Sequence, residues 1–447
     1  MGKWISFGAY NNLYKYIWLY LVFRLLYVYI FQYKTIPLEL KFFTLESFPN
    51  YHIFTGSFFE YISMFLFSFL LHRYELYQLR KEEYRNSIAN SKVSKTGSSG
   101  AFTLIQMKIN NEKLLSKYFY LLIITLVLAN IIMSSYYNCY LEGADFWELE
   151  LLLISLVNTM IFGIQIYRHQ ILAIYFVIIS CSILKIISLI DIFKNDEEKL
   201  YKVYIWVIPI AIIGFIFAEF LKSYAYCKAR YYFNLKFISI SRFMKFYGLL
   251  GSIICLLGSI ISTYTECTSY YDNKNIKYVC RIYETSHNYF DNFKIYFDRF
   301  WNKETTSENV KYVFLFILKN LFICTTNFFT FCTIKHLGPE YTVCANTFYY
   351  LIIEILKGIG YLISHENEFE KYKTISEIFS IIGSGIYLEF IELNFCKLNY
   401  NSKKNIAFRS FSEASELSLI EEGREKIESR RKSKKIEYDP DDSIIIN

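Results

Sequence analysis

The chain has 447 residues, of which 54% are hydrophobic, 20% are aromatic and only 20% are charged. This balance excludes a disordered chain and a small disulfide scaffold, and 42 Tyr with 42 Phe argue against a soluble multidomain enzyme, whose surface must face water. The net charge of +7 comes from basic residues that cluster in particular segments. That clustering favours membrane orientation over a nucleic-acid partner.

Ten segments are long and apolar enough to predict helices that cross a lipid bilayer, which takes about 20 mostly apolar residues. They are residues 13–32, 52–72, 118–138, 147–167, 171–193, 201–221, 245–264, 311–334, 340–363 and 374–393. Continuous apolar runs such as Ile171–Ile183 and Val203–Phe217 exclude alternating, half-buried strands. We therefore predict an all-α integral membrane protein with ten transmembrane helices, the first of them an uncleaved span.

The loops between these spans predict an orientation. The 73–117 and 222–245 loops and the tail after 393 are rich in Lys and Arg, whereas Cys139–Phe146 and His365–Glu370 are acidic. With ten spans, every basic segment falls on one side, so both termini are expected in the cytosol. Two locations are compatible with the sequence: an endomembrane (Golgi, ER or vacuole) and the plasma membrane.

Three stretches outside the spans have distinct compositions. The Ser/Gly-rich residues 86–103 predict a flexible connector within the 73–117 loop, and the polar residues 397–447 predict a disordered cytosolic tail. A basic cluster in that tail is alternatively suited to an anionic lipid surface. The long extracytosolic loop 265–310 contains Cys267 and Cys280, which an oxidising compartment would allow to form a disulfide. The sequence is equally compatible with this disulfide and with two free thiols.

Motifs that carry enzyme or metal chemistry are missing from the sequence. It contains no Gly-x-Ser-x-Gly, Walker A or dinucleotide fingerprint, no zinc-type Cys-x-x-Cys pair, and no close-spaced set among its six histidines. We therefore expect neither an enzyme nor a bound cofactor or metal.

Polar side chains within the predicted spans are the candidate substrate-binding residues, because such groups are costly in lipid unless they face protein or water. In spans eight and nine they are Lys319, Asn320, Asn327, Asn346, Tyr350, Glu354 and Lys357. In spans one and two they are Arg24 and Glu60, which form a second group with Glu219 of span six. Glu354 and Lys357 are three residues apart and can pair within one helix. The alternative is structural: buried Asn often only bonds a neighbouring helix, and Arg24 can extend toward a span end.

Span seven differs, since small residues recur along it at heptad spacing from Gly248 to Ser262. Small residues let helix backbones approach closely in lipid, so this stripe predicts a close helix–helix contact.

Several short stretches carry a family resemblance. They are Tyr167–Gln170 between spans four and five, the basic Lys222–Lys236 connector followed by Phe246–Gly251, Leu337–Pro339 between spans eight and nine, and a final Gly383–Phe395 helix before a basic tail. Together with the ten-span layout, they resemble the drug/metabolite transporter superfamily, in particular its solute carrier 35-type (nucleotide-sugar) and chloroquine-resistance-transporter-like branches. The resemblance is strongest over 201–396.

That resemblance implies two inverted five-helix repeats, residues 1–194 and 195–396, with spans 1–4 and 6–9 around a central site and transport by alternating access. The expected function is a secondary transporter or exchanger of a small polar metabolite, acting in a lipid bilayer and able to form a homodimer. The alternative is a non-transporting membrane scaffold or receptor-like protein that keeps the carrier fold and signals through its tail.

Overall fold

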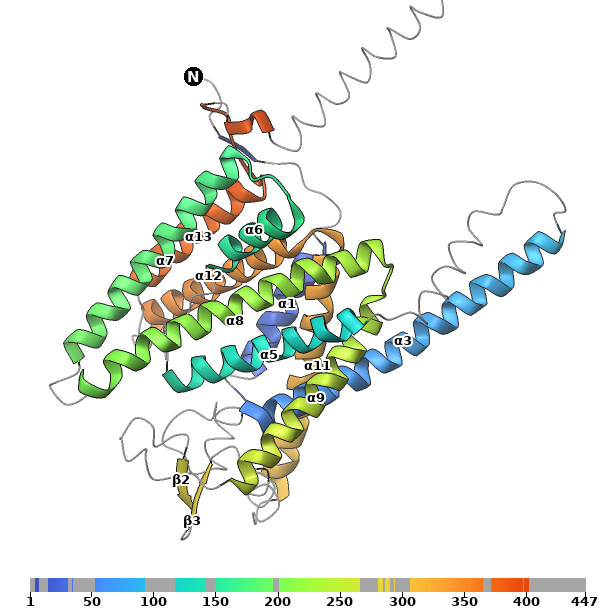
Figure 1. Ribbon diagram of the computed structural model, residues 1–447, viewed down its shortest axis with the longest axis horizontal. Coiled ribbons are helices and arrows are strands. Elements are labelled where there is room, and N and C mark those ends of the chain that lie inside the picture. Colours follow the sequence, from blue (N-terminus) through green and yellow to red (C-terminus); the bar gives the residue numbers. More distant parts are fainter. Residues whose placement is uncertain are drawn as a thin grey trace, which may run out of the picture.

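The computed structural model describes residues 5–7, 15–30, 34, 53–92, 117–140, 149–195, 201–265, 280–283, 286–289, 293, 306–364, 371–396 and 398–401. Ten helices dominate this part of the chain (Figure 1). They are α1 (Lys15–Ile30), α3 (Ile53–Lys92), α5 (Lys117–Tyr140), α6 (Leu149–Phe162), α7 (Arg168–Asn195), α8 (Tyr201–Leu235), α9 (Ile240–Tyr264), α11 (Thr306–His336), α12 (Pro339–Ser364) and α13 (Lys371–Tyr387). Each predicted span coincides with one of these helices.

Four of the helices, within the part of the chain that the structure describes, contain segments long and apolar enough to cross a membrane. These segments are Phe54–Lys81, Lys117–Ser134, Ile240–Tyr264 and Val310–His336. Two shorter apolar helices accompany them, Leu149–Phe162 and Arg168–Ile183. Length and composition thus identify a candidate multi-pass membrane protein.

The surface differs from that of a water-soluble protein, although the interior is also mainly apolar. Large apolar residues form an outward face on α1, where Trp18, Val22 and Leu26 are exposed at four-residue intervals. Acidic side chains are buried instead: Glu150, Glu219 and Glu354 are all less than 4% exposed, among others. An exposed apolar face with charges inside is the arrangement that a hydrocarbon solvent favours.

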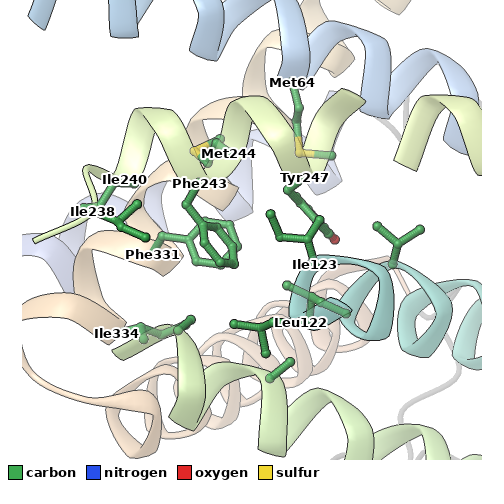
Figure 2. Close-up of a cluster of buried hydrophobic side chains, with 14 of the residues drawn as sticks. Met64, Leu122, Ile123, Ile238, Ile240, Phe243, Met244, Tyr247, Phe331 and Ile334 are labelled. Carbon is green, nitrogen blue, oxygen red and sulfur yellow. The ribbon is translucent and has the colours of Figure 1, made fainter. Parts of the chain in front are cut away.

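The helices associate mainly in four pairs: α3 with α9, α7 with α13, α1 with α11, and α5 with α8. Figure 1 shows α7 running along α13 and α9 crossing α3. The largest apolar cluster lies where α5, α8, α9 and α11 meet (Figure 2). There the Phe243 ring lies 4.9 Å from that of Phe331 and 5.8 Å from that of Phe119. Edge-to-face and tilted rings at these separations stabilise a core beyond area burial alone.

The small-residue stripe of span seven is the contact with α3, as predicted. A Cβ atom added to Gly248 would lie 2.4 Å from the backbone nitrogen of Phe65. One turn along, a Cβ on Gly251 would meet the Tyr61 ring, also at 2.4 Å. The glycines therefore allow an approach that a larger side chain would prevent.

Two short strand pairs accompany the helices. Strand β1 (Ile5–Phe7) pairs antiparallel with β4 (Ile391–Leu393), so Ser6 lies opposite Glu392. Strands β2 (Cys280–Tyr283) and β3 (Ser286–Tyr289) form a hairpin within the 265–310 loop. The first pair brings two segments from opposite ends of the sequence together.

Two predicted loops are partly helical. The 73–117 loop was expected after residue 72, but α3 continues to Lys92 and includes the start of the Ser/Gly-rich stretch. The prediction of a loop at 222–245 is wrong over most of that range, because α8 continues to Leu235 and α9 begins at Ile240. Lys222 was placed in that loop as a basic topogenic residue; it lies inside the bundle instead, next to two glutamates.

Two predicted helix ends also differ. Span four was expected to reach residue 167, but α6 ends at Phe162 because Gly163 takes the left-handed backbone conformation (φ 64°). Residues 163–167 form the link, and Tyr167–Gln170 is not a turn, since α7 already begins at Arg168. The expected Gly383–Phe395 helix ends at Tyr387, where Glu389 adopts φ 63° before strand β4 begins.

Cys267 lies outside the described residues, as do residues 93–116 and 402–447. The Cys267–Cys280 disulfide, the remainder of the flexible connector and the disordered tail therefore stay predictions.

Candidate intramembrane polar site

Charged side chains from six helices are turned into the bundle. Those of the candidate site come from α1, α3, α6, α8, α11 and α12, and α9 and α13 bury Arg242 and Glu377 as well, so both halves of the chain contribute. A charge in a low-dielectric interior persists only when it is paired or hydrogen-bonded. The partner of each buried charge therefore shows which helices these polar contacts join.

Lys319 and Glu60 form the first group. The Lys319 Nζ lies 3.3 Å from the Glu60 Oε1, and the two side chains are 9% and 23% exposed. This ion pair joins α11 to α3. The sequence predicted both residues as candidates but placed them in separate groups, because a salt bridge between helices far apart in the chain leaves no signal in spacing.

Arg24 forms the second group, near the middle of α1. Its guanidinium lies over the ring of Tyr349 on α12, 5.3 Å from the ring centroid. The Arg24 Nε is inaccessible to solvent and has no hydrogen-bond partner among the described residues. Beside it, the Tyr20 hydroxyl donates to the Asn346 Oδ1, which joins α1 to α12 a second time. Arg24 thus faces another helix rather than extending toward a span end.

The two asparagines of α11 make ordinary structural bonds. The Asn320 Nδ2 donates to the Phe316 carbonyl oxygen at 2.9 Å, and the Asn327 Nδ2 lies 3.3 Å from the Met64 sulfur. The Asn320 Oδ1, in contrast, is buried without a hydrogen-bond partner in the described part of the chain. The structural alternative therefore applies to Asn327, while Asn320 retains an acceptor directed into the interior.

Three further candidates lie on α12. Glu354 is buried, and Tyr350, one turn earlier, is half-buried with its ring 5.1 Å from that of Tyr349. Lys357 belongs to α12, but its side chain lies outside the described atoms. Its pairing with Glu354 stays a prediction.

The sequence predicted one member of the third charged group, Glu219, and missed the other two, Glu150 and Lys222. The Lys222 Nζ lies 3.1 Å from the Glu150 Oε2 of α6 and 3.4 Å from the Glu219 Oε2 on its own helix. The two glutamate side chains are only 2% and 1% exposed. The spacing of Glu219 and Lys222, three residues apart after an unbroken apolar run, was the available signal. Ending the span at residue 221 hid it.

Tyrosines connect the three groups. Tyr20 lies within electrostatic range of Arg24, Glu150 and Lys222. Tyr27 lies within range of Glu60, Lys319 and Arg24. The three groups together hold three cations and three carboxylates, so their formal charges cancel. The structure therefore brings Arg24, Glu60, Glu219, Lys319 and Asn346 into one polar region and adds Glu150 and Lys222 to it.

No protein-family model matches this chain, and no curated protein matches it. The fold and the polar interior define it as a helical protein with candidate membrane spans and buried ion pairs.

Proposed function

We propose that this chain is a multi-pass membrane transporter or exchanger that moves a small polar metabolite by alternating access, on the ten-span fold of the drug/metabolite transporters. The observation that carries the proposal is the set of charged side chains paired inside a bundle of apolar helices. Ionisable residues inside membrane helices are expensive, and they commonly line a substrate or ion pathway.

The helix pairing supports two five-helix repeats. Counted in order along the chain, α3 is second and α9 seventh, while α7 is fifth and α13 tenth, so each of these pairs joins helices five places apart. The pairs α1 with α11 (first and eighth) and α8 with α5 (sixth and third) exchange under the same five-place shift. This is the pattern expected of two repeats related by a pseudo-twofold axis, and five spans per repeat would invert the second.

The strand pair β1–β4 supports an even number of spans. It holds Ile5–Phe7 beside Ile391–Leu393, so the segments before the first helix and after the last lie at the same end of the bundle. Both termini would then face the cytosol, in agreement with the basic loops.

The ion pairs suit a mechanism in which helices separate and close again. Lys319 and Glu60 sit on α11 and α3, which belong to different proposed repeats. A polar substrate that replaces one partner would weaken this link and favour another arrangement of the repeats, provided that it binds the two arrangements with different affinity. In this proposal Lys319, Glu60 and Asn320 contact the substrate.

The test is uptake by the full chain reconstituted into liposomes, with a panel of nucleotide-sugars, amino acids, and organic cations and anions. We expect uptake of at least one class, and a loss of at least tenfold in Lys319→Met and in Glu60→Gln. The matched control is Lys228→Met, since Lys228 contacts aromatic rings on the same bundle rather than a carboxylate (Phe162 at 5.4 Å). An absence of uptake across the panel, or variants as active as the wild type, would refute the proposal.

A second candidate is a non-transporting scaffold. The specific observation in its favour is α3, which has 40 residues and at 1.5 Å per residue is about 60 Å long, twice a bilayer core. Figure 1 shows its C-terminal half extending beyond the other helices. If the chain is a scaffold, removing residues 82–92 will abolish partner capture, and the reconstituted protein will show no uptake.

A further inference from the structure

We infer that Arg24 and the tyrosines around it form a binding subsite for a singly charged organic anion, namely a carboxylate attached to a planar or apolar group. This inference rests on the proposed transport function, whose substrate class it narrows. It stands on the position of Arg24 between α1 and α12 and on the chemistry of its neighbours.

Arg24 differs from the two lysines of the polar region, because its observed contact is with an aromatic ring rather than with a carboxylate. Lys319 has Glu60 at 3.3 Å and Lys222 has Glu150 at 3.1 Å, so these two carboxylates already pair with lysines. Among the described residues, no carboxylate forms an ion pair with Arg24, and its Nε has no hydrogen-bond acceptor. A buried guanidinium edge without an acceptor costs free energy that an incoming anion would recover.

The neighbours of Arg24 are four tyrosines, which lie within electrostatic range of its guanidinium: Tyr20, Tyr27, Tyr349 and Tyr350. Tyr349 covers one face of the guanidinium plane, which leaves the N–H edge to make hydrogen bonds. That edge is a planar fork that fits the two oxygens of a carboxylate. The phenol rings offer apolar faces to the rest of the ligand, as Tyr349 and Tyr350 already do to each other.

The charge count favours a monoanion over a phosphate. The polar region is already neutral, with three cations and three carboxylates, so a bound anion adds uncompensated negative charge. A monoanion adds one such charge, next to the Arg24 guanidinium, whereas a phosphate dianion would add two and require a second cation. The next cation, Lys319, is held by Glu60 and would have to break that pair. A carboxylate therefore leaves the neighbouring ion pair intact.

In this structure Arg24 is half-buried and its Nε is inaccessible to solvent. An anion reaches it when α1 and α12 separate, and α1 also contacts α11. Alternating access supplies such a separation.

The experiment measures thermal unfolding of the full chain in detergent with benzoate, the neutral isostere benzamide, or inorganic phosphate. Benzoate is expected to raise Tm by at least about 2 °C at saturation, while benzamide leaves it unchanged. In Arg24→Gln the benzoate affinity should fall roughly ten- to a hundredfold, the loss expected when a charged hydrogen-bond donor is removed. Arg24→Lys keeps the charge without the planar fork and should give an intermediate affinity.

The matched control is Arg73→Gln. Arg73 also lies over an aromatic ring (Phe69, 5.2 Å), but it is exposed on α3, and its loss should leave benzoate binding unchanged. Equal shifts with benzoate and benzamide, a shift with phosphate alone, or benzoate binding that survives Arg24→Gln would overturn the inference. If Arg24→Gln does not fold, the comparison of benzoate with benzamide on the wild type decides.

The two proposals fail differently. Arg24-dependent benzoate binding without uptake of any solute would refute transport and leave the anion subsite standing. Uptake of neutral or cationic solutes that is indifferent to benzoate and to Arg24→Lys would overturn the subsite and leave transport standing.

Discussion

Lys222 shows how much a single buried charge determines in this protein. Its ammonium lies within 3.4 Å of two carboxylates, Glu150 and Glu219, that are almost completely removed from solvent. The folded state depends on the Lys222 cation, because without it the two buried glutamates would repel each other in a low-dielectric interior where they have lost their hydration. The net value of this charged group relative to an apolar core is smaller, because burying the ions is itself costly.

Lys222→Met is therefore expected to destabilise the protein strongly, by about 3–5 kcal/mol, since it leaves both glutamates without their cation. Thermal unfolding in detergent, followed by tyrosine and tryptophan fluorescence, measures this loss. The triple variant Lys222→Met/Glu150→Gln/Glu219→Gln should recover most of the lost Tm. Lys228→Met is the control and should change Tm little. A triple variant no more stable than Lys222→Met would mean that the lysine stabilises the fold by packing rather than by charge.

At the scale of elements, the contact between α3 and α9 depends on the absence of side chains. Gly248 and Gly251 bring α9 against the backbone of Phe65 and the ring of Tyr61. Polar groups add to the contact further along, where the Thr55 and Ser259 hydroxyls are 2.8 Å apart. A helix pair held in this way tolerates extra volume poorly, because the obstructing atoms at Gly248 belong to the backbone.

Gly248→Ala should consequently cost about 1–3 kcal/mol, as overpacked cores do, although alanine is the better helix former. The measurement is Tm in detergent, with Ile253→Ala on the exposed side of the same helix as the control. If Gly248→Ala is as stable as the wild type, the two helices are farther apart than described.

The sequence predicted elements better than it predicted contacts. Ten apolar segments became ten helices, because the length and continuity of an apolar run are local properties. Helix ends were predicted less well. Gly163 and Glu389 end helices through a left-handed backbone conformation, and α8 continues past Lys222 because two glutamates neutralise its charge.

For the candidate site, too, the sequence predicted the residues better than it predicted their partners. Intramembrane polarity alone selected Arg24, Glu60, Lys319 and Asn346, and these do lie in one polar region. Which carboxylate serves which cation depends on helices that are distant in sequence, such as α3 and α11. Spacing within one helix contains no information on that choice, so the Lys319–Glu60 pair and the Glu150 member of the Lys222 group required the fold.

At the scale of the whole molecule, the β1–β4 pair allows the proposed topology to be tested. Ser6 lies opposite Glu392 in an antiparallel register, where Cβ atoms are about 4.5–5.5 Å apart, within reach of an engineered disulfide. The Ser6→Cys/Glu392→Cys variant should therefore crosslink under mild oxidation, seen as a mobility shift after cleavage of an intervening loop by protease. The single variants are controls for the native cysteines. No crosslink would place the two ends apart and argue against an even number of spans.

The partners of α1 also set the order in which the protein can be assembled during its synthesis. Helix α1 leaves the ribosome before the two helices that it contacts, α11 and α12, have been made. In the proposed ten-span topology, Arg24 therefore enters the bilayer long before Tyr349 exists to cover it, and an arginine at the centre of a lone helix opposes insertion by about 2.5–3.5 kcal/mol. On that topology, helix α1 is made before α11 and α12 but is buried only after they have been made, and substitutions in α12 should cause defects in the insertion of α1.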